Sequence, residues 1–320
     1  MNDAIEARAL VRRFGDKEAV AGVDLTVASG EIYGFLGPNG AGKSTTVRML
    51  TTLLRPTSGT ARVAGFDVAD EAEKVRLRIG VALQDAALDP KQTGRELLDL
   101  QGRLYGLSKI DRRARVAELL ELVAIGDAID DRIGTYSGGM KRRLDLAAAL
   151  VHQPQVLFLD EPTTGLDPTS RAAVWSEVRY LNEELGMTIL LTTQYLEEAD
   201  ALANRVGIIA QGRLVAEGTP EALKRAIGSD LIVARVATGD GSAAVDAVAS
   251  LHQVERVEMA HDATGDEVVV SVGDGASAIS PIAVALADAG VRVTGLTLRT
   301  PTLDDVFLHI TGGRMQDDAA

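Results

Sequence analysis

The sequence contains 320 residues, of which 46% are hydrophobic and 25% charged, a composition typical of globular proteins. At roughly 150 residues per domain, this length predicts about two domains. The absence of cysteine excludes disulfide bonds, thiol nucleophiles and cysteine-based metal sites. No apolar run approaches the roughly 18 residues needed to cross a bilayer, and the N-terminal residues are too acidic and polar for a signal peptide. We therefore expect a soluble, intracellular protein.

Negative charge is unevenly distributed along the chain. The formal net charge of −13 argues against a nucleic-acid partner, because proteins that bind nucleic acids need an excess of Lys and Arg. Residues 226–320 contain 14 Asp/Glu, five Arg and no Lys, a net charge of −9. This shift predicts a boundary near residue 225. We expect a first domain of residues 1–225, an accessory domain of residues 226–312 and a flexible tail of residues 313–320.

Strand and helix patterns alternate through the first domain. Apolar or β-branched runs predict strands at Ile5–Val11, Val23–Val27, Ile32–Leu36, Arg62–Ala64, Ile79–Leu83, Val156–Leu159 and Thr188–Leu191. The last two runs are uninterrupted, which is typical of strands buried on both faces of a parallel sheet. A helix is predicted over Thr45–Leu54, and helical spacing of apolar residues predicts a mostly helical insert at about 86–150. The pattern predicts an α/β core of the P-loop type with a helical subdomain.

The accessory domain has a different rhythm. Strands and helices are predicted in the order strand 231–237, helix 243–251, strands 254–260 and 267–272, helix 279–289 and strand 291–298. This β-α-β-β-α-β order indicates a small α+β module of the ferredoxin-like kind. A last helix, Thr302–Ile310, is expected to pack back on it.

A phosphate-binding loop follows the predicted strand at 32–36. The segment Gly37, Pro38, Asn39, Gly40, Ala41, Gly42, Lys43 and Ser44, with Thr45 after it, fits G-x-x-x-x-G-K-[ST] between a strand and a helix. Glycines let backbone N–H groups surround a phosphate chain, and the helix N-terminus adds positive charge. Lys43 would bind the β- and γ-phosphates, and Ser44 would bind Mg²⁺.

Two adjacent acids end the predicted strand at 156–159. From this position Asp160 can reach Mg²⁺ through water, while Glu161 can polarise an attacking water molecule. This pair favours hydrolysis over the phosphorylation of a second substrate.

A second anion-binding pattern, the signature motif, consists of Ser137, Gly138 and Gly139. Ser137 is a natural helix N-cap, and the glycines expose backbone N–H groups before a predicted helix. One domain has no use for two triphosphate sites, so we expect each motif to complete the phosphate loop of a partner copy. The basic run Lys141-Arg142-Arg143 after it is expected to be solvated.

Together these motifs resemble a known family. The phosphate loop, Gln84, YSGGM, VLFLDEP and GLDP follow the order and spacing of an ABC transporter ATP-binding subunit across residues 1–225. More narrowly, YSGGM, TTQYLEEAD and PTLDDVFL resemble the daunorubicin/doxorubicin-resistance ATP-binding proteins. Those proteins serve exporters whose membrane subunits are separate chains, and they share the C-terminal extension. The resemblance implies a P-loop ABC ATPase core that uses ATP and Mg²⁺.

The resemblance also implies residue roles. Phe14 matches the aromatic that stacks on adenine, with core packing as its alternative, and Glu161 matches the general base. Gln84 matches the glutamine that touches Mg²⁺ and the attacking water, in a loop that meets the membrane subunit; its alternative is a polar strand end. The signature motif would close over the partner's γ-phosphate. Asp167 matches the loop that connects the two active sites.

One position departs from the family pattern. Gln194 stands where the family has a histidine that contacts the γ-phosphate. Glutamine can donate an amide hydrogen bond but cannot carry positive charge. We interpret Gln194 as a functional substitute; the alternative is a weakened or inactive hydrolytic centre.

These patterns favour an ATPase subunit of an exporter. Two copies would dimerise head to tail around two Mg-ATP and drive efflux of a drug, lipid or natural product through separate membrane-spanning permease subunits. The chain would be cytoplasmic, peripheral on the cytoplasmic face of the membrane. The alternative is a soluble regulatory ABC ATPase not coupled to transport, although the sequence has no second cassette or basic region. In a third hypothesis, the accessory domain senses a ligand and gates the ATPase.

Overall fold

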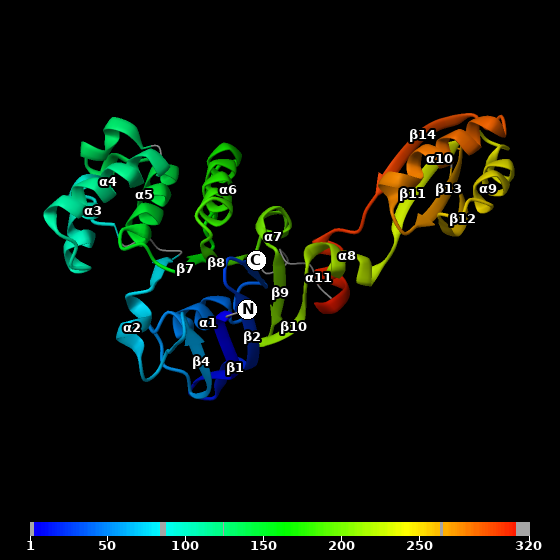
Figure 1. The fold of residues 1–320 in the computed structure, drawn as a ribbon. Helices are drawn as coiled ribbons and strands as arrows, with labels where there is room; N and C mark the ends of the chain where they lie inside the picture. The colour runs from blue at the N-terminus through cyan, green and yellow to red at the C-terminus, as the bar shows by residue number, and fades with distance from the viewer. Residues whose placement is uncertain (1–2, 84–87, 124, 263–264, 312–320) are drawn as a thin grey trace. The chain divides into compact units, whose positions relative to one another are not determined.

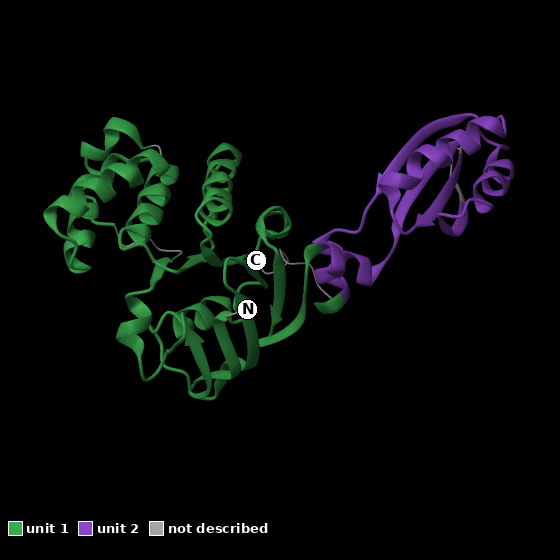
Figure 2. Ribbon diagram, in the orientation of Figure 1, with its two compact units in different colours: residues 1–220, 310–320 green, residues 221–309 purple. Residues whose placement is uncertain are grey.

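The computed structural model describes residues 3–83, 88–123, 125–262 and 265–311 (Figure 1). The chain divides into two compact units, Met1–Pro220 with Ile310–Ala320 and Glu221–His309 (Figure 2). This boundary lies five residues before the one suggested by the charge distribution. The predicted tail at 313–320 lies outside the described residues.

An antiparallel sheet in unit 1 has the strand order β2-β1-β4-β5. Its strands are β1 (Asp3–Phe14), β2 (Lys17–Ala28), β4 (Ser58–Val63) and β5 (Phe66–Asp67). The hairpin of β1 and β2 is longer than the apolar runs predicted, because polar residues at its open and turn ends still pair across the ladder. Val20, Val23 and Leu25 of β2 are buried, and this face packs onto the core of the unit.

The second sheet of unit 1 has the order β10-β9-β3-β8-β7-β6, in which only the β10–β9 pair is antiparallel. Its strands are β3 (Ile32–Leu36), β6 (Ile79–Ala82), β7 (Val156–Asp160), β8 (Thr188–Thr193), β9 (Arg205–Ala210) and β10 (Arg213–Gly218). β7 and β8 are buried throughout, as their apolar runs predicted. Leu36 pairs with Thr193, and Asp160 pairs with Thr192. The carboxyl ends of β3, β7 and β8 therefore meet at one edge of the sheet.

Helices cover this sheet and follow its strands. They are α1 (Lys43–Leu50), α2 (Ala72–Arg76), α6 (Pro168–Glu183) and α7 (Leu196–Leu202). The helix α8 (Pro220–Ile227) comes next after β10 in the chain, and all but its first residue belongs to unit 2. The helix predicted over Thr45–Leu54 is present with different bounds: α1 begins two residues earlier, within the phosphate loop, and ends at Leu50. Thr51 caps α1, and Thr52 has a φ of 65°, which ends the helix.

A helical subdomain occupies the insert that the apolar spacing predicted. It contains α3 (Gly94–Leu104), α4 (Lys109–Val123), 3₁₀ turns at Gly126–Asp130 and Ile133–Thr135, and α5 (Gly138–Leu150). Thr93 and Glu96 form a capping box that begins α3. Leu98, Leu119 and Leu144 bring the three helices together around a buried apolar core. The first residues of the predicted insert, 86 and 87, lie outside the described residues.

Unit 2 has the predicted β-α-β-β-α-β order. Its elements are β11 (Asp230–Val236), α9 (Gly241–Ala249), β12 (Val254–Asp262), β13 (Gly265–Val272), α10 (Gly275–Asp288) and β14 (Val293–Arg299), followed by α11 (Leu303–Thr311). The sheet order β12-β13-β11-β14, with antiparallel neighbours, is that of a ferredoxin-like module. Val248 of α9 and Ile282 of α10 pack onto buried valines of the sheet.

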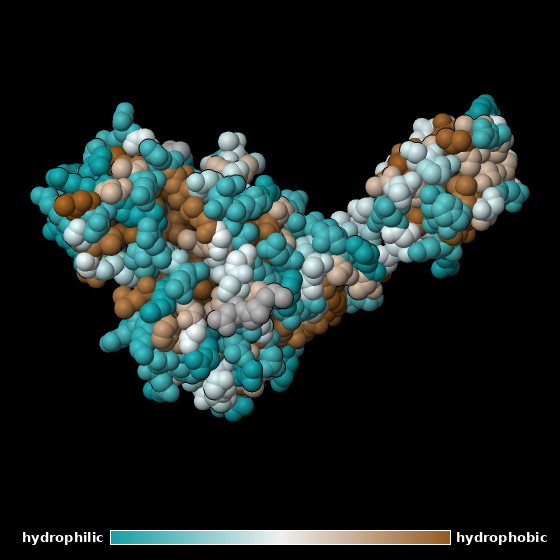
Figure 3. Space-filling view, in the orientation of Figure 1, coloured by the Kyte–Doolittle hydropathy of each residue, from teal (hydrophilic) through white to brown (hydrophobic). Residues whose placement is uncertain are grey.

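The visible surface is mostly polar (Figure 3). Apolar residues gather where the helical subdomain faces α6 (Figures 1 and 3). Among the described residues, no helix combines the length and the apolar character that a bilayer span requires.

Candidate nucleotide site

A cavity of about 370 Å³ opens beside the phosphate loop. Its lining comes from the end of β1, the start of β2, the loop before α1 and the turn after β7, and consists of Phe14, Lys17, Ala19, Pro38, Asn39, Gly40, Gly42, Lys43, Ser44, Thr45 and Glu161. The structure thus brings together most residues of the predicted phosphate loop and Glu161 of the acid pair. Gly37 and Ala41 belong to the same loop but do not line the cavity.

Glycine is required at two loop positions. A Cβ at Gly42, whose φ is 110°, would lie 2.6 Å from the carbonyl oxygen of Ala19. At Gly37 it would lie 2.4 Å from the carbonyl oxygen of Ile209. The loop is therefore pressed against β2 and β9, and Gly42 forms the cap of α1. The N-terminus of this helix favours a bound anion because its first N–H groups lack partners within the helix.

Lys43 is the buried cation of the cavity. Its side chain is 4% exposed, and Nζ donates to the carbonyl oxygens of Gly37 and Pro38 at 2.6 and 3.3 Å. Nζ also pairs with Oε1 of Glu161 at 3.4 Å. Desolvation lowers the pKa of Lys43, while Glu161 and Asp160 oppose this shift. The ammonium group is thus surrounded by oxygen atoms that phosphate oxygens could replace.

Glu161 adopts a left-handed backbone conformation with a φ of 50°. Its N–H donates to the carbonyl and hydroxyl oxygens of Thr192 at 3.1 Å each. Thr164 Oγ1 donates to the second carboxylate oxygen of Glu161 at 3.4 Å. Residues held in such sparsely populated conformations cluster at active sites, where surrounding contacts maintain them. Here β8 fixes the backbone that directs Glu161 toward the phosphate loop.

Asp160 lies behind Ser44, at the end of β7. Its Oδ1 accepts hydrogen bonds from Ser44 Oγ at 3.2 Å and from Thr192 Oγ1 at 2.5 Å. A hydroxyl and a carboxylate are hard oxygen donors of the kind that Mg²⁺ prefers, so this pair fits that ion. In the described part of the chain, no cluster of three His, Cys, Asp or Glu could hold a metal. The remaining oxygens would come from water and phosphate. Gln84, the other predicted ligand, lies outside the described residues.

Phe14 is 48% exposed at the edge of the cavity, which excludes the alternative of core packing. The guanidinium carbon of Arg12 lies 4.6 Å from the centre of its ring. Lys17, at the start of β2, lines the same cavity. Sequence reasoning missed Arg12 and Lys17, because neither belongs to a motif; the hairpin of β1 and β2 brings Lys17 into the cavity lining and Arg12 against the ring of Phe14.

The signature motif begins α5, away from this cavity. Ser137 Oγ accepts a hydrogen bond from the N–H of Met140 at 3.2 Å, as expected of an N-cap. Ser137 and Gly138 are exposed, and the described lining of the cavity includes no residue of the motif. Gly139 lies close to the start of α6, since a Cβ there would be 3.0 Å from Ser170 Oγ.

Asp167 caps α6. Its carboxylate accepts hydrogen bonds from the N–H groups of Thr169 and Ser170 at 3.0 Å each, and from Ser170 Oγ. The Ser170 hydroxyl is the largest cause that holds the pKa of Asp167 below its usual value. The exposed start of α6 and the exposed signature motif therefore lie next to each other.

Gln194 follows β8 and is half-buried. It comes two residues after Thr192, the residue that pairs with Asp160 across β7 and β8. It is absent from the described lining of the phosphate-loop cavity. Gln194 thus lies at the same sheet edge as Asp160 without contributing to the cavity wall.

The expectation that residues 141–143 are solvated is wrong for Arg142. Its side chain is 10% exposed and spans from α5 to two other segments. Nε donates to the carbonyl oxygen of Pro162 at 2.9 Å, Nη1 to that of Leu83 at 2.7 Å and Nη2 to that of Asp160 at 3.3 Å. Sequence reasoning saw a charged helix face but had no sign of acceptors contributed by distant segments.

A groove of about 370 Å³, here called the lateral groove, lies between α3, α5 and the residues around β6. Its lining includes Leu53, Leu83, Leu88 and Asp145. His152, which follows α5, lines this groove and stacks on Tyr105 with ring centres 3.7 Å apart.

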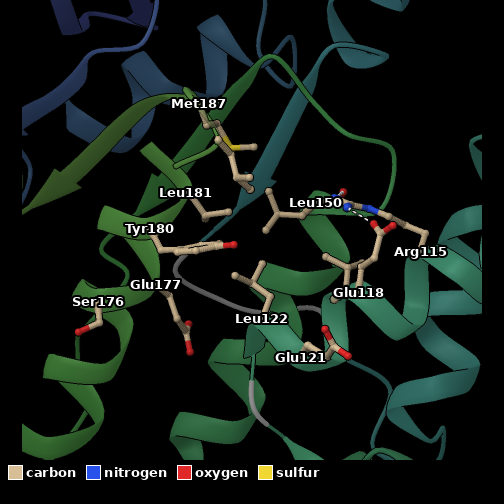
Figure 4. A pocket seen from close by; sticks show the side chains of 12 residues that line it. Arg115, Glu118, Glu121, Leu122, Leu150, Ser176, Glu177, Tyr180, Leu181 and Met187 are labelled. Carbon is tan, nitrogen blue, oxygen red and sulfur yellow. Dashed lines mark hydrogen bonds and ion pairs between the residues drawn. The ribbon is translucent and has the colours of Figure 1, made fainter. Parts of the chain in front are cut away.

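A larger cavity of about 590 Å³, the Glu177 cavity, separates α4 and α5 from α6 (Figure 4). Leu122, Leu150, Leu181 and Met187 give it an apolar wall. Burial raises the pKa of Glu177 in this wall to about 7, and Arg143 opposes the shift.

Comparison with known proteins agrees with this geometry. Residues 20–164 match the ABC transporter family model, and residues 218–311 match the C-terminal domain of DrrA1-3-like ATP-binding proteins. The daunorubicin resistance ATP-binding protein DrrA2 of Streptomyces coeruleorubidus is 49% identical over 99% of this chain and 98% of its own length. The chain belongs to the ABC transporter ATP-binding proteins. Like other members of this family, it is an ATPase whose hydrolysis of ATP serves transport.

Two further members support the assignment. The daunorubicin/doxorubicin resistance ATP-binding protein DrrA of Streptomyces peucetius is 46% identical over 98% of this chain and 94% of its own length. A dimeric ATP-binding cassette solved in a post-hydrolysis state with ADP and phosphate superposes with a TM-score of 0.62 and 26% identity. That match covers 67% of this chain and 98% of the cassette. The resemblance predicted from the motifs is confirmed.

Proposed function

We propose that two copies of this ABC ATPase enclose two Mg-ATP molecules head to tail and drive the efflux of a drug, lipid or natural product. The proposal rests on the separation of two groups of nucleotide-binding residues within one chain. Lys43, Ser44 and Glu161 share one cavity, while the exposed signature motif lies outside its described lining. A partner copy supplies the missing N–H groups and hydroxyl to the γ-phosphate.

Hydrolysis is assigned to the groups around the phosphate loop. Lys43 binds the phosphate oxygens in place of the carbonyl oxygens that it contacts here. Glu161 orients the attacking water molecule and accepts its proton. Ser44, Asp160 and Gln84 would hold Mg²⁺, which supplies positive charge to the phosphates when bound.

Three further residues, in the cavity, at the sheet edge and at the start of α6, contact the nucleotide or connect the two sites. Phe14 has an exposed ring on which adenine stacks. Gln194 donates an amide hydrogen bond toward the γ-phosphate from the sheet edge that carries Asp160. Asp167, which fixes the start of α6 beside the signature motif, links the two sites of the dimer.

The lateral groove is the proposed contact with a separate permease subunit. Its lining includes the apolar side chains of Leu53, Leu83 and Leu88. Leu83 and Leu88 border residues 84–87 in the sequence, the segment that the family resemblance assigns to the contact with the membrane subunit. A short helix or loop of the permease would bury these side chains, so the ATPase would work at the cytoplasmic face of the membrane. The names of the relatives, which describe resistance to daunorubicin and doxorubicin, support a drug or natural product as the cargo.

Light scattering of Glu161→Gln with and without Mg-ATP tests the dimer. We expect a monomer that becomes a dimer only with Mg-ATP, because bound nucleotide joins the cavity of one copy to the signature motif of the other. The double variant Glu161→Gln/Lys43→Met, which lacks the phosphate-binding cation, should stay monomeric. A Glu161→Gln chain that binds ATP yet stays monomeric, or one that is dimeric in both conditions, would contradict nucleotide-driven closure.

Leu53→Asp tests the permease contact. Leu53 is 60% exposed and lines the lateral groove, so the substitution should leave the ATPase activity of the isolated chain unchanged. In cells that contain the permease, we expect loss of the chain from the membrane fraction. Unchanged membrane recovery would favour the alternative of a regulatory ATPase not coupled to transport.

A further inference from the structure

We infer that Arg142 is a positioning residue for hydrolysis, which connects the signature helix α5 to the backbone around Glu161. The inference rests on the proposed dimer, because the signature motif then contacts the partner's nucleotide. Arg142 lies five residues after Ser137, a little more than one turn into α5. A shift of the α5 N-terminus, which would contact the partner's nucleotide, therefore also shifts the Arg142 side chain.

The acceptors of Arg142 lie on both sides of the catalytic carboxylate. Nη2 donates to the carbonyl oxygen of Asp160, and Nε to that of Pro162, so the guanidinium brackets the residue between them, Glu161. Glu161 has a left-handed backbone, a strained conformation that persists only where surrounding contacts maintain it. Thr192 provides one such restraint from β8, and Arg142 provides another from α5.

Two further contacts extend the link. Nη1 donates to the carbonyl oxygen of Leu83, the residue that precedes Gln84. The same nitrogen pairs with Oδ2 of Asp145 at 3.3 Å, and Asp145 lines the lateral groove. One guanidinium thus joins the signature helix α5, Leu83 after β6 and the turn of Glu161 within one chain.

Lysine cannot reproduce this geometry. A guanidinium has five N–H donors in a rigid fork, whereas an ammonium group is a compact point charge on a flexible stem. Arg142→Lys keeps the charge beside Asp145 but cannot span the carbonyl oxygens of Leu83, Asp160 and Pro162 at once. We expect kcat to fall about tenfold or more, because small displacements of a catalytic group are costly.

Arg115→Lys is the matched control. Arg115 is an arginine of the helical subdomain, 18% exposed, that donates to the carbonyl oxygen of Leu150 and pairs with Glu118. No contact recorded for it in the described structure involves the turn of Glu161. Both variants are measured for ATPase kcat and KM, for melting temperature and, with Glu161→Gln added, for Mg-ATP-driven dimerisation by light scattering.

The inference predicts a split result. Arg142→Lys should lower kcat while leaving KM, the melting temperature and dimerisation close to those of Arg115→Lys, because Arg142 does not line the nucleotide cavity. An unchanged kcat, or a fall in kcat matched by equal losses of ATP affinity and stability, would overturn it.

If Arg142→Lys does not fold, Asp145→Asn is the second variant, because it removes one anchor of the guanidinium. It should lower kcat less steeply at constant KM, and an unchanged kcat there overturns the inference. Failure of the parent Glu161→Gln to dimerise identifies failure of the proposed function instead.

Discussion

The phosphate-loop cavity and the N-terminus of α5 are built in opposite ways. At the cavity, Lys43 and Glu161 are buried and paired with each other, and Asp160 is buried behind Ser44, whose hydroxyl donates to it. At α5, Ser137 and Gly138 are exposed, and the serine side chain does no more than cap its own helix. Charged groups are buried only where partners compensate for lost water, whereas an exposed helix N-terminus keeps its N–H groups ready for an anion.

This contrast indicates that one chain carries two incomplete halves of a site. The cavity has the groups for phosphate binding and water activation, and it is open to solvent at Phe14, which is 48% exposed. The start of α5 has the donors for a phosphate and, among the described residues, lies outside the lining of its own cavity. The predictions below separate these two halves, from the largest expected effect to the smallest.

Glu161→Gln should nearly abolish ATP hydrolysis in the cavity without weakening ATP binding. General-base catalysis contributes about a hundredfold or more to rates, and glutamine cannot accept the proton. Turnover measured as phosphate release should fall by that amount, while titration with a fluorescent ATP analogue should show retained affinity. Retained turnover would remove Glu161 as the base.

Ser137→Asp should break the other half alone. Aspartate caps helices as well as serine does, so the free energy of unfolding should change by no more than about a few tenths of a kcal/mol. The melting temperature should therefore stay within about 1 °C of that of the parent. Its negative charge would repel the γ-phosphate of the partner's nucleotide. In the Glu161→Gln background, ATP-driven dimerisation should weaken roughly tenfold or more.

The matched variant Ser137→Thr, which keeps both the cap and the hydroxyl, should dimerise normally. A dimer of the aspartate variant as tight as its parent would mean that Ser137 serves α5 only.

Gln194→His tests the departure from the family at the sheet edge. A histidine can add a charged hydrogen bond to the γ-phosphate, and charge-assisted bonds are roughly twice as strong as neutral ones. Turnover should equal that of the unmodified chain or exceed it by up to roughly fivefold. Complete loss of turnover would show that the site is organised around the amide.

Glu177→Gln should change stability and leave turnover unaltered, because a half-buried carboxylate outside the nucleotide cavity has no catalytic partner. The pKa of Glu177 is raised to about 7 by burial, so its neutral form stabilises the fold at low pH. That stability is lost as pH rises from the ordinary pKa of 4.5 to about 7 and is absent at higher pH. Chemical denaturation should show little difference at pH 5 and a gain on the order of 1–3 kcal/mol for the variant at pH 8.5. A gain of equal size at both pH values would contradict the assignment.

Much of the site could be predicted because its signals lie in contiguous residues. The phosphate loop, the acid pair after a buried strand and the cap at Ser137 each combine a local pattern with a local structural requirement. The ferredoxin-like order of unit 2 followed from periodicity for the same reason.

The remaining features depend on residues that only the fold brings together. The backbone acceptors of Arg142 lie 18 to 59 residues away in the sequence. Thr192, which restrains both Asp160 and Glu161, lies 32 and 31 residues from them in the sequence. Neither residue type carries a signal of its own, since an arginine on a helix and a threonine at a strand end are commonplace. Burial of Arg142 against three carbonyl oxygens is a consequence of how α5 packs beside β6 and β7.

Mixing two inactive variants tests the division of the site most directly. Lys43→Met disables the cavity of a chain, and Ser137→Asp disables its signature motif, so each variant alone should lack turnover. In a mixed head-to-tail dimer, the intact cavity of one chain meets the intact signature motif of the other. We therefore predict that ATPase activity appears on mixing. A mixture as inactive as either variant alone would contradict the account and place both halves in the site of a single chain.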